Sequence, residues 1–108
     1  MFTLVGCVPS SPEKAIRKLE EAGYEVDGSY DSFYNDIYDV EGINYVLNAY
    51  KDSRNSLTII YFDNASQAKD GFDNIMEHAK LQITKIYFEQ KGKCVYFGTK
   101  TAMKDFEK

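Results

Sequence analysis

Histidine, cysteine and tryptophan are scarce or missing in this sequence of 108 residues, which has one His, two Cys and no Trp. A catalytic triad needs a nucleophile and an orienting acid around a histidine, and the sequence shows no such grouping at His78. The spacing of Cys7 and Cys94 matches no zinc or redox motif, and it allows one disulfide at most. No glycine-rich phosphate-binding loop is present either. We therefore expect no catalytic residues, no metal site and no cofactor.

Long apolar runs and a surplus of basic residues are also lacking. No stretch approaches the roughly 18 apolar residues that a membrane-spanning helix needs. The formal net charge is −4, whereas a protein that contacts nucleic-acid phosphates needs a basic surface. The composition therefore predicts no transmembrane segment and no nucleic-acid partner.

Apolar and aromatic residues, by contrast, are plentiful enough for one folded domain. Hydrophobic residues make up 44% of the chain, and nine Tyr and seven Phe supply much of their bulk. A chain of this length and composition buries a core without the help of several disulfides or a structural metal.

The stretch from Ser56 to Lys80 predicts a strand that leads directly into an amphipathic helix. β-Branched, aromatic and aliphatic residues dominate residues 57–62, as in a buried strand. Asn64 is suited to cap the following helix, with Gln67 completing a capping-box-like pair. Gly71 interrupts this helix, and a close approach to the sheet would explain it. Apolar side chains recur at spacings of three and four on one helix face: Ala65, Ala68, Phe72, Ile75, Met76 and Ala79.

Two hairpins and two further helices complete the pattern. A serine caps the first helix, and Gly23 ends it in a left-handed turn. The first hairpin ends in the strand over residues 57–62, and the second turns at Gly92. The predicted bounds are helix 12–22, strand 43–50, strand 83–89, strand 94–97 and a short helix after Thr99.

These elements predict a two-layer α+β domain over residues 12–108. We expect an antiparallel sheet of four or five strands, with two main helices and a short C-terminal helix packed mostly on one face. Residues 1–11 form a separate N-terminal segment. The alternative makes residues 2–8 a first strand, which gives the domain a ferredoxin-like start.

The N-terminal segment contains the motif Leu4-Val5-Gly6-Cys7. It resembles the lipobox of bacterial lipoproteins, in which a small residue precedes a cysteine that is lipidated and becomes the mature N-terminus. A secretory signal also needs a positive region and an apolar region, so the resemblance implies residues upstream of Met1. It further implies a lipid anchor at Cys7, a cell-envelope location and no bond between Cys7 and Cys94. The alternatives are a chance match and a cytoplasmic location.

Tyrosines predict a contact face on the sheet. If the phenylalanines of the later strands lie beneath the helices, strand alternation sends their neighbours to the opposite face: Tyr61, Lys85, Tyr87 and Tyr96. With the helices on the phenylalanine side, this face stays open for contact with another molecule; cross-strand pairing of exposed tyrosines is the alternative. We predict a non-catalytic binding or interaction module for an unidentified protein or small ligand. The alternative is a cytosolic ligand-binding or regulatory domain that forms a homodimer through the open sheet face.

Overall fold

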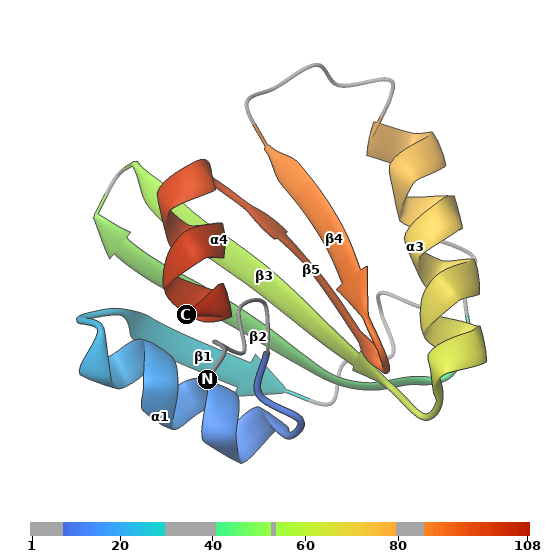
Figure 1. The fold of residues 1–108 in the computed structure, drawn as a ribbon, viewed down its shortest axis with the longest axis horizontal. Coiled ribbons are helices and arrows are strands. Elements are labelled where there is room, and N and C mark those ends of the chain that lie inside the picture. The colour runs from blue at the N-terminus through green and yellow to red at the C-terminus, as the bar shows by residue number, and fades with distance from the viewer. Residues whose placement is uncertain (1–7, 30–40, 53, 80–85) are drawn as a thin grey trace, which may run out of the picture.

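A computed structural model describes residues 8–29, 41–52, 54–79 and 86–108, which form one five-stranded sheet and three helices (Figure 1). Residues 1–7, and with them Cys7 and most of the alternative first strand, lie outside the described residues, as do residues 83–85. The elements are α1 (Pro12–Glu21), β1 (Glu25–Ser29), β2 (Ile43–Asp52), β3 (Asn55–Phe62), α3 (Ala65–Ala79), β4 (Tyr87–Lys91), β5 (Cys94–Gly98) and α4 (Lys100–Glu107).

The strands follow the order β1-β2-β3-β5-β4, and every neighbouring pair is antiparallel. The two predicted hairpins supply the pairs β2–β3 and β4–β5, and β5 then returns to pair with β3. The predicted α+β class, with a single antiparallel sheet, is therefore confirmed. Among the described helices, none is long and apolar enough to cross a membrane.

The capping residues predicted for two helices, a serine for α1 and Asn64 for α3, are confirmed. The reciprocal bond expected from Gln67 is not formed, because its buried side-chain oxygen has no hydrogen-bond partner among the described residues. The Ser11 side chain accepts a hydrogen bond of 3.4 Å from the Lys14 amide at the start of α1. The Asn64 side chain accepts one of 2.8 Å from the Gln67 amide at the start of α3. Each bond satisfies an amide that has no partner within its helix, so these helix starts follow from local sequence.

A β-bulge at Asn44 changes the side-chain pattern of β2. Ile43 pairs with Phe62 and Tyr45 pairs with Tyr61, so two steps along β2 match one step along β3. Ile43 consequently packs with Phe62 on one sheet face, whereas Tyr45 and Leu47 lie on the other. Strict alternation would have put Ile43 with Tyr45, and the extra residue is what separates them.

The helices divide between the two faces of the sheet. Buried side chains of α1 and α4 join one core cluster, which holds Ile59 and Tyr61 of β3. Side chains of α3 join a second cluster, which holds Ile60 and Phe62. Because neighbouring residues of a strand point to opposite faces, α3 lies across the sheet from α1 and α4. Figure 1 shows α1 and α4 together on the near side of the sheet, with α3 apart from them.

The expectation that the helices gather mostly on one face therefore holds for α1 and α4, whereas α3 covers part of the other face. The further expectation that the tyrosine-bearing face has no helix over it is wrong. α3 packs on the phenylalanine side as predicted, but α1 and α4 occupy the side that was expected to be open.

Gly71 allows α3 to approach the sheet closely. A Cβ atom at this position would lie 2.4 Å from Cζ of Phe62, far inside van der Waals contact. The Phe62 side chain is itself buried in the second core cluster, so it has little room to move away. The glycine therefore has the packing reason that its position in the sequence suggested.

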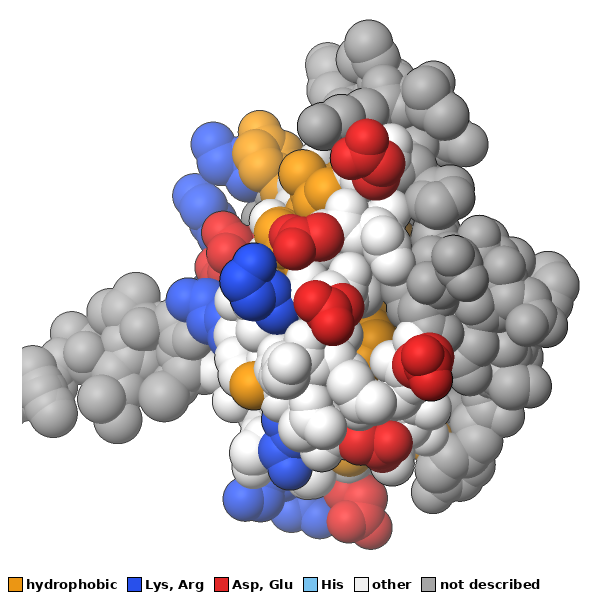
Figure 2. All heavy atoms as spheres, turned by 90° about the vertical axis from the view of Figure 1, so that its right-hand side faces the viewer, with side chains coloured by type: hydrophobic (Ala, Val, Ile, Leu, Met, Phe, Trp, Pro, Cys, Tyr) orange, Lys and Arg blue, Asp and Glu red, His pale blue; other side chains and the backbone are white. Residues whose placement is uncertain are grey.

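The outer surface of α3 is charged. Lys69, Asp70, Asp73 and Glu77 are all exposed, and Lys69 pairs with Asp73 at 3.4 Å. Figure 2 looks onto this side and shows acidic and basic side chains among small, separate hydrophobic patches. Such a mixed surface is what solvent contact favours, and it leaves α3 with one apolar face toward the sheet.

Candidate functional site

A pocket lies between residues 8–10 and the turn of the β4–β5 hairpin. Its volume is about 420 Å³, which falls within the range of small-molecule sites. Its described lining consists of Val8, Pro9, Ser10, Tyr61, Lys91, Gly92, Lys93 and Cys94.

Tyr61 and Cys94 lie where β3 and β5 meet the pocket. They face each other across the β3–β5 pairing, and they are 4% and 3% exposed. The Tyr61 hydroxyl donates a hydrogen bond of 3.0 Å to the carbonyl oxygen of Pro9. This bond joins residues far apart in the chain, and it holds Pro9 against the sheet.

The β4–β5 turn forms the other edge of the pocket, and two hydrogen bonds hold its backbone in place. Gly92 has a φ of +58°, a left-handed conformation that favours glycine. The Gln90 side-chain amide donates 2.7 Å to the Gly92 carbonyl, and the Phe62 amide donates 2.8 Å to the Lys93 carbonyl. The turn is thus tied both to its own hairpin and to the end of β3.

The Cys94 thiol is not poised to act as a nucleophile. Burial raises its pKa to about 12, although a hydrogen bond with Tyr61 acts in the opposite direction. Burial also raises the pKa of Tyr61 above its ordinary value, and the neighbouring Cys94 adds to that shift. Both groups are therefore neutral near pH 7, and a thiol rather than a thiolate is a poor nucleophile.

The tyrosines of the predicted contact face lie on one side of the sheet, but most of them are not exposed. Tyr61, Tyr87 and Tyr96 do lie on one sheet face, as alternation predicted, since they pair with Cys94, Gly98 and Ile59. Tyr61 and Tyr96 are buried, whereas Tyr87 is 50% exposed. Lys85 lies outside the described residues.

The α4 helix is the physical reason for the burial of Tyr96. The Tyr96 and Phe106 rings meet edge to face with centroids 4.9 Å apart. The Tyr96 hydroxyl donates 2.6 Å to a Glu107 carboxylate oxygen, so the polar tip also has a partner. Residues 8–10 cover Tyr61 in a similar way. Of the predicted face, Tyr87 is the described side chain that stays available for contact.

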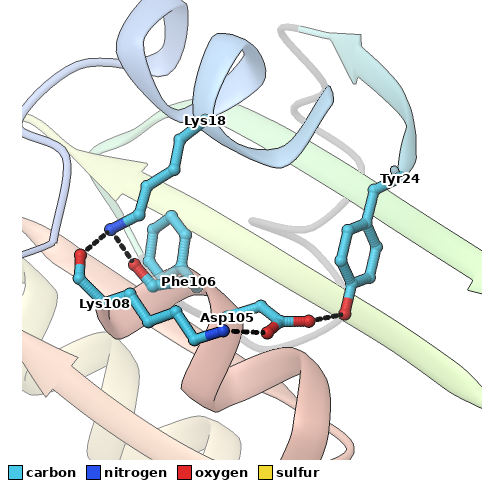
Figure 3. A network of polar contacts seen from close by, with 5 residues as sticks. All are labelled: Lys18, Tyr24, Asp105, Phe106 and Lys108. Atoms are coloured by element: carbon cyan, nitrogen blue, oxygen red, sulfur yellow. Dashed lines mark hydrogen bonds and ion pairs between the residues drawn. The ribbon is translucent and has the colours of Figure 1, made fainter. Parts of the chain in front are cut away.

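A polar network joins α1 to α4 on the same side of the sheet (Figure 3). The Lys18 ammonium donates to the backbone carbonyls of Phe106, at 2.7 Å, and Lys108, at 2.5 Å. Tyr24 donates 2.8 Å to Asp105, and the Lys108 ammonium lies 3.2 Å from the same carboxylate. A cation near a helix C-terminus stabilises the helix, so Lys18 clamps the end of α4.

The pKa values in this network reflect its hydrogen bonds. Burial raises the pKa of Tyr24, and the bond to Asp105 raises it further. Burial by itself would raise the pKa of Asp105, but hydrogen bonds from Tyr24 and Lys108 outweigh it and hold the pKa below its usual range. The network is a structural clamp rather than a reactive site, because every one of its charges is engaged within it.

Within the described ranges, no group of three or more His, Cys, Asp or Glu side chains is placed to hold a metal ion. Cys94 is a free thiol there. The predictions about the lipidation of Cys7 and about its separation from Cys94 stay predictions.

The sequence offered little to identify the pocket. Pairing of the two hairpins could have placed Tyr61 opposite Cys94, since both residues lie on predicted strands. The return of residues 8–10 to that edge depends on contacts across more than fifty positions, of which the Tyr61–Pro9 bond is one. No local periodicity or motif reports such a contact.

A scan against protein-family models finds no match to this chain. Searches of curated proteins and of solved structures also find no match.

Proposed function

We propose that this protein is a non-catalytic binding module that holds a small ligand between residues 8–10 and the β4–β5 turn. The observation that carries the proposal is the pocket itself, about 420 Å³ in volume. Pockets of this size accept small organic molecules and are too small for a protein surface. The proposal therefore favours a small ligand over a protein partner.

The chemistry of the lining supports binding without turnover. Cys94 and Tyr61 have raised pKa values and stay protonated near neutral pH. The described lining contains no His, Asp or Glu to accept or donate a proton. General acid–base or nucleophilic catalysis needs such groups near the reacting atoms.

The test is a fragment screen followed by amide chemical shifts. We expect fragments that bind to shift the amide signals of Gly92, Lys93 and Cys94 and to be recovered unchanged. Ser10→Tyr places a large side chain at the pocket edge from an exposed position, so binding should be lost. Ser66→Tyr is the matched control, because Ser66 is exposed on α3, away from the pocket.

Two outcomes would overturn the proposal. If no fragment shifts the pocket amides, the cavity is not a binding site. If a bound fragment is chemically converted, and Ser10→Tyr abolishes the conversion, the module is an enzyme.

The place of the module in the cell is a separate proposal. The lipobox-like residues that end at Cys7 support a lipid-anchored domain at a bacterial cell envelope, with a cytoplasmic domain as the alternative. Metabolic labelling with an alkyne fatty acid tests it in cells that carry the full gene. Label that Cys7→Ser removes supports the anchor, and an unlabelled protein supports the cytoplasmic alternative.

A further inference from the structure

We infer that the pocket selects small organic anions, with the Lys91 and Lys93 ammonium groups binding the charged end of the ligand. This inference rests on the proposed function, and it names the class of ligand that the same pocket takes. Three features of the lining support it: its charges, its hydrogen-bonding groups, and the hydrogen bonds that hold the hairpin turn at the pocket edge.

All formal charges in the described lining are positive. Lys91 and Lys93 flank Gly92 at the exposed end of the hairpin, and no acidic residue lines the pocket with them. Neither ammonium group has a hydrogen-bond or ion-pair partner elsewhere in the described part of the chain. The seven residues that precede Val8 also contain no Asp or Glu. In a chain with a net charge of −4, this pocket is therefore a local site of positive charge.

Three carbonyl groups around the pocket already accept hydrogen bonds. The Tyr61 hydroxyl donates to Pro9, the Gln90 amide donates to Gly92, and the Phe62 amide donates to Lys93. Among the exposed side chains of the lining, the two ammonium groups can only donate hydrogen bonds and the Ser10 hydroxyl can donate one. A ligand with hydrogen-bond acceptors fits such a lining, and a carboxylate supplies two acceptor oxygens with the complementary charge.

The remainder of the lining is apolar, and the hairpin turn at its edge is held by hydrogen bonds. Val8, Pro9 and the Tyr61 ring offer surface for a hydrocarbon or aromatic body. The backbone bonds at Gly92 and Lys93 fix where the two lysines leave the chain. An apolar body with one anionic end therefore matches the pocket better than an inorganic anion does.

Matched probes separate charge from shape. We would titrate 4-phenylbutyrate and decanoate, together with the corresponding uncharged amides and amines, and follow the amide shifts of Gly92, Lys93 and Cys94. The carboxylates should bind about tenfold more tightly than their amides, as a charge-assisted hydrogen bond predicts, and the amines should bind weakest. Added salt should reduce the preference for the carboxylates, because ions screen exposed charges.

Variants then assign the preference to the two lysines. Lys91→Gln with Lys93→Gln should bring carboxylate affinity down to about that of the amide. Lys14→Gln with Lys100→Gln removes the same charge from exposed positions on α1 and α4, and it should leave the preference intact. Unfolding curves for both double variants verify that each still folds.

The outcomes distinguish this inference from the proposed function. If the amides or amines bind at the pocket as well as the carboxylates, the anion preference is wrong and the binding function stands. The same conclusion follows if the control variant loses the preference as fully as the Lys91/Lys93 variant. If no probe of any charge shifts the pocket amides, the proposed function fails and this inference fails with it.

Discussion

Individual tyrosines on one sheet face have very different surroundings. Tyr96 is fully buried against Phe106 of α4, and Tyr61 is 4% exposed beneath residues 8–10. Tyr87 lies on the edge strand β4 and is half exposed. Alternation along a strand assigns the face of a side chain, but the element packed above it decides whether the side chain is core or surface.

Substitution of these tyrosines should show the difference directly. Tyr61→Ser and Tyr96→Ser should each lower the free energy of unfolding by roughly 3–5 kcal/mol, as for other large buried aromatics. Tyr87→Ser should change it by less than about 1 kcal/mol, because the side chain is exposed. Urea unfolding followed by circular dichroism measures all three. A Tyr61→Ser variant as stable as Tyr87→Ser would show that residues 8–10 do not cover Tyr61 in solution.

Helices α1 and α4 are held together by more than apolar packing. The clamp formed by Lys18, Tyr24, Asp105 and Lys108 joins the first helix of the domain to the last (Figure 3). Tyr24 takes part because Gly23, at a φ of +97°, turns the chain back, and the Tyr24 amide then donates 2.9 Å to Leu19. The local stop signal of α1 thus also positions a long-range contact.

The clamp should make stability depend on pH in the acid range. The pKa of Asp105 is lowered in the folded state, so its contribution is present above the ordinary aspartate pKa, about 3.9, and is lost as pH falls through the lower folded value. Asp105→Asn should therefore cost about 1 kcal/mol at pH 7 and much less near pH 2. Urea unfolding at the two pH values measures the difference.

Asp73→Asn is the matched control for that comparison. Asp73 also pairs with a lysine on its own helix, but both side chains of that pair are highly exposed, at 69% and 60%. Such a pair contributes little, so this variant should show a small effect at either pH. Equal effects for the two variants would contradict the clamp.

The whole molecule buries apolar side chains on both faces of its sheet. The larger cluster lies between the sheet and the pair α1 and α4, and the smaller one lies beneath α3. Cys94 belongs to the larger cluster and also lines the pocket. The accessibility of its thiol therefore measures both the opening of this core and the exposure of the pocket.

Alkylation of Cys94 should therefore follow unfolding. In a Cys7→Ser variant, iodoacetamide at pH 8 should react slowly, because Cys94 is 3% exposed and burial raises its pKa to about 12. The rate should rise with urea along the unfolding curve, since access requires opening of the core. Mass spectrometry over time measures the reaction. Rapid labelling in native buffer would show that the pocket exposes the thiol.

Local sequence determined much of this protein. The capping residues Ser11 and Asn64, the glycine turns and the inward face of α4 all follow from interactions within a few residues. So do the strands of both hairpins, although β2 and β4 each run two residues past the predicted end. Side-chain period, capping and turn chemistry are short-range effects, and they can be deduced without the rest of the chain. The bulge at Asn44 was not predictable in this way, because it is a property of the pairing between β2 and β3, and no residue pattern within β2 marks it.

Tertiary structure alone decided which sheet face each helix covers, and with it the nature of the candidate site. An amphipathic helix reveals that it has an apolar face, but not which side of a two-faced sheet that face will meet. That choice placed α4 over Tyr96 and drew residues 8–10 onto Tyr61. The surface that was expected to be open is therefore core, and the pocket lies beside it. Both features depend on contacts between distant parts of the chain, and such contacts have no local signature in the sequence.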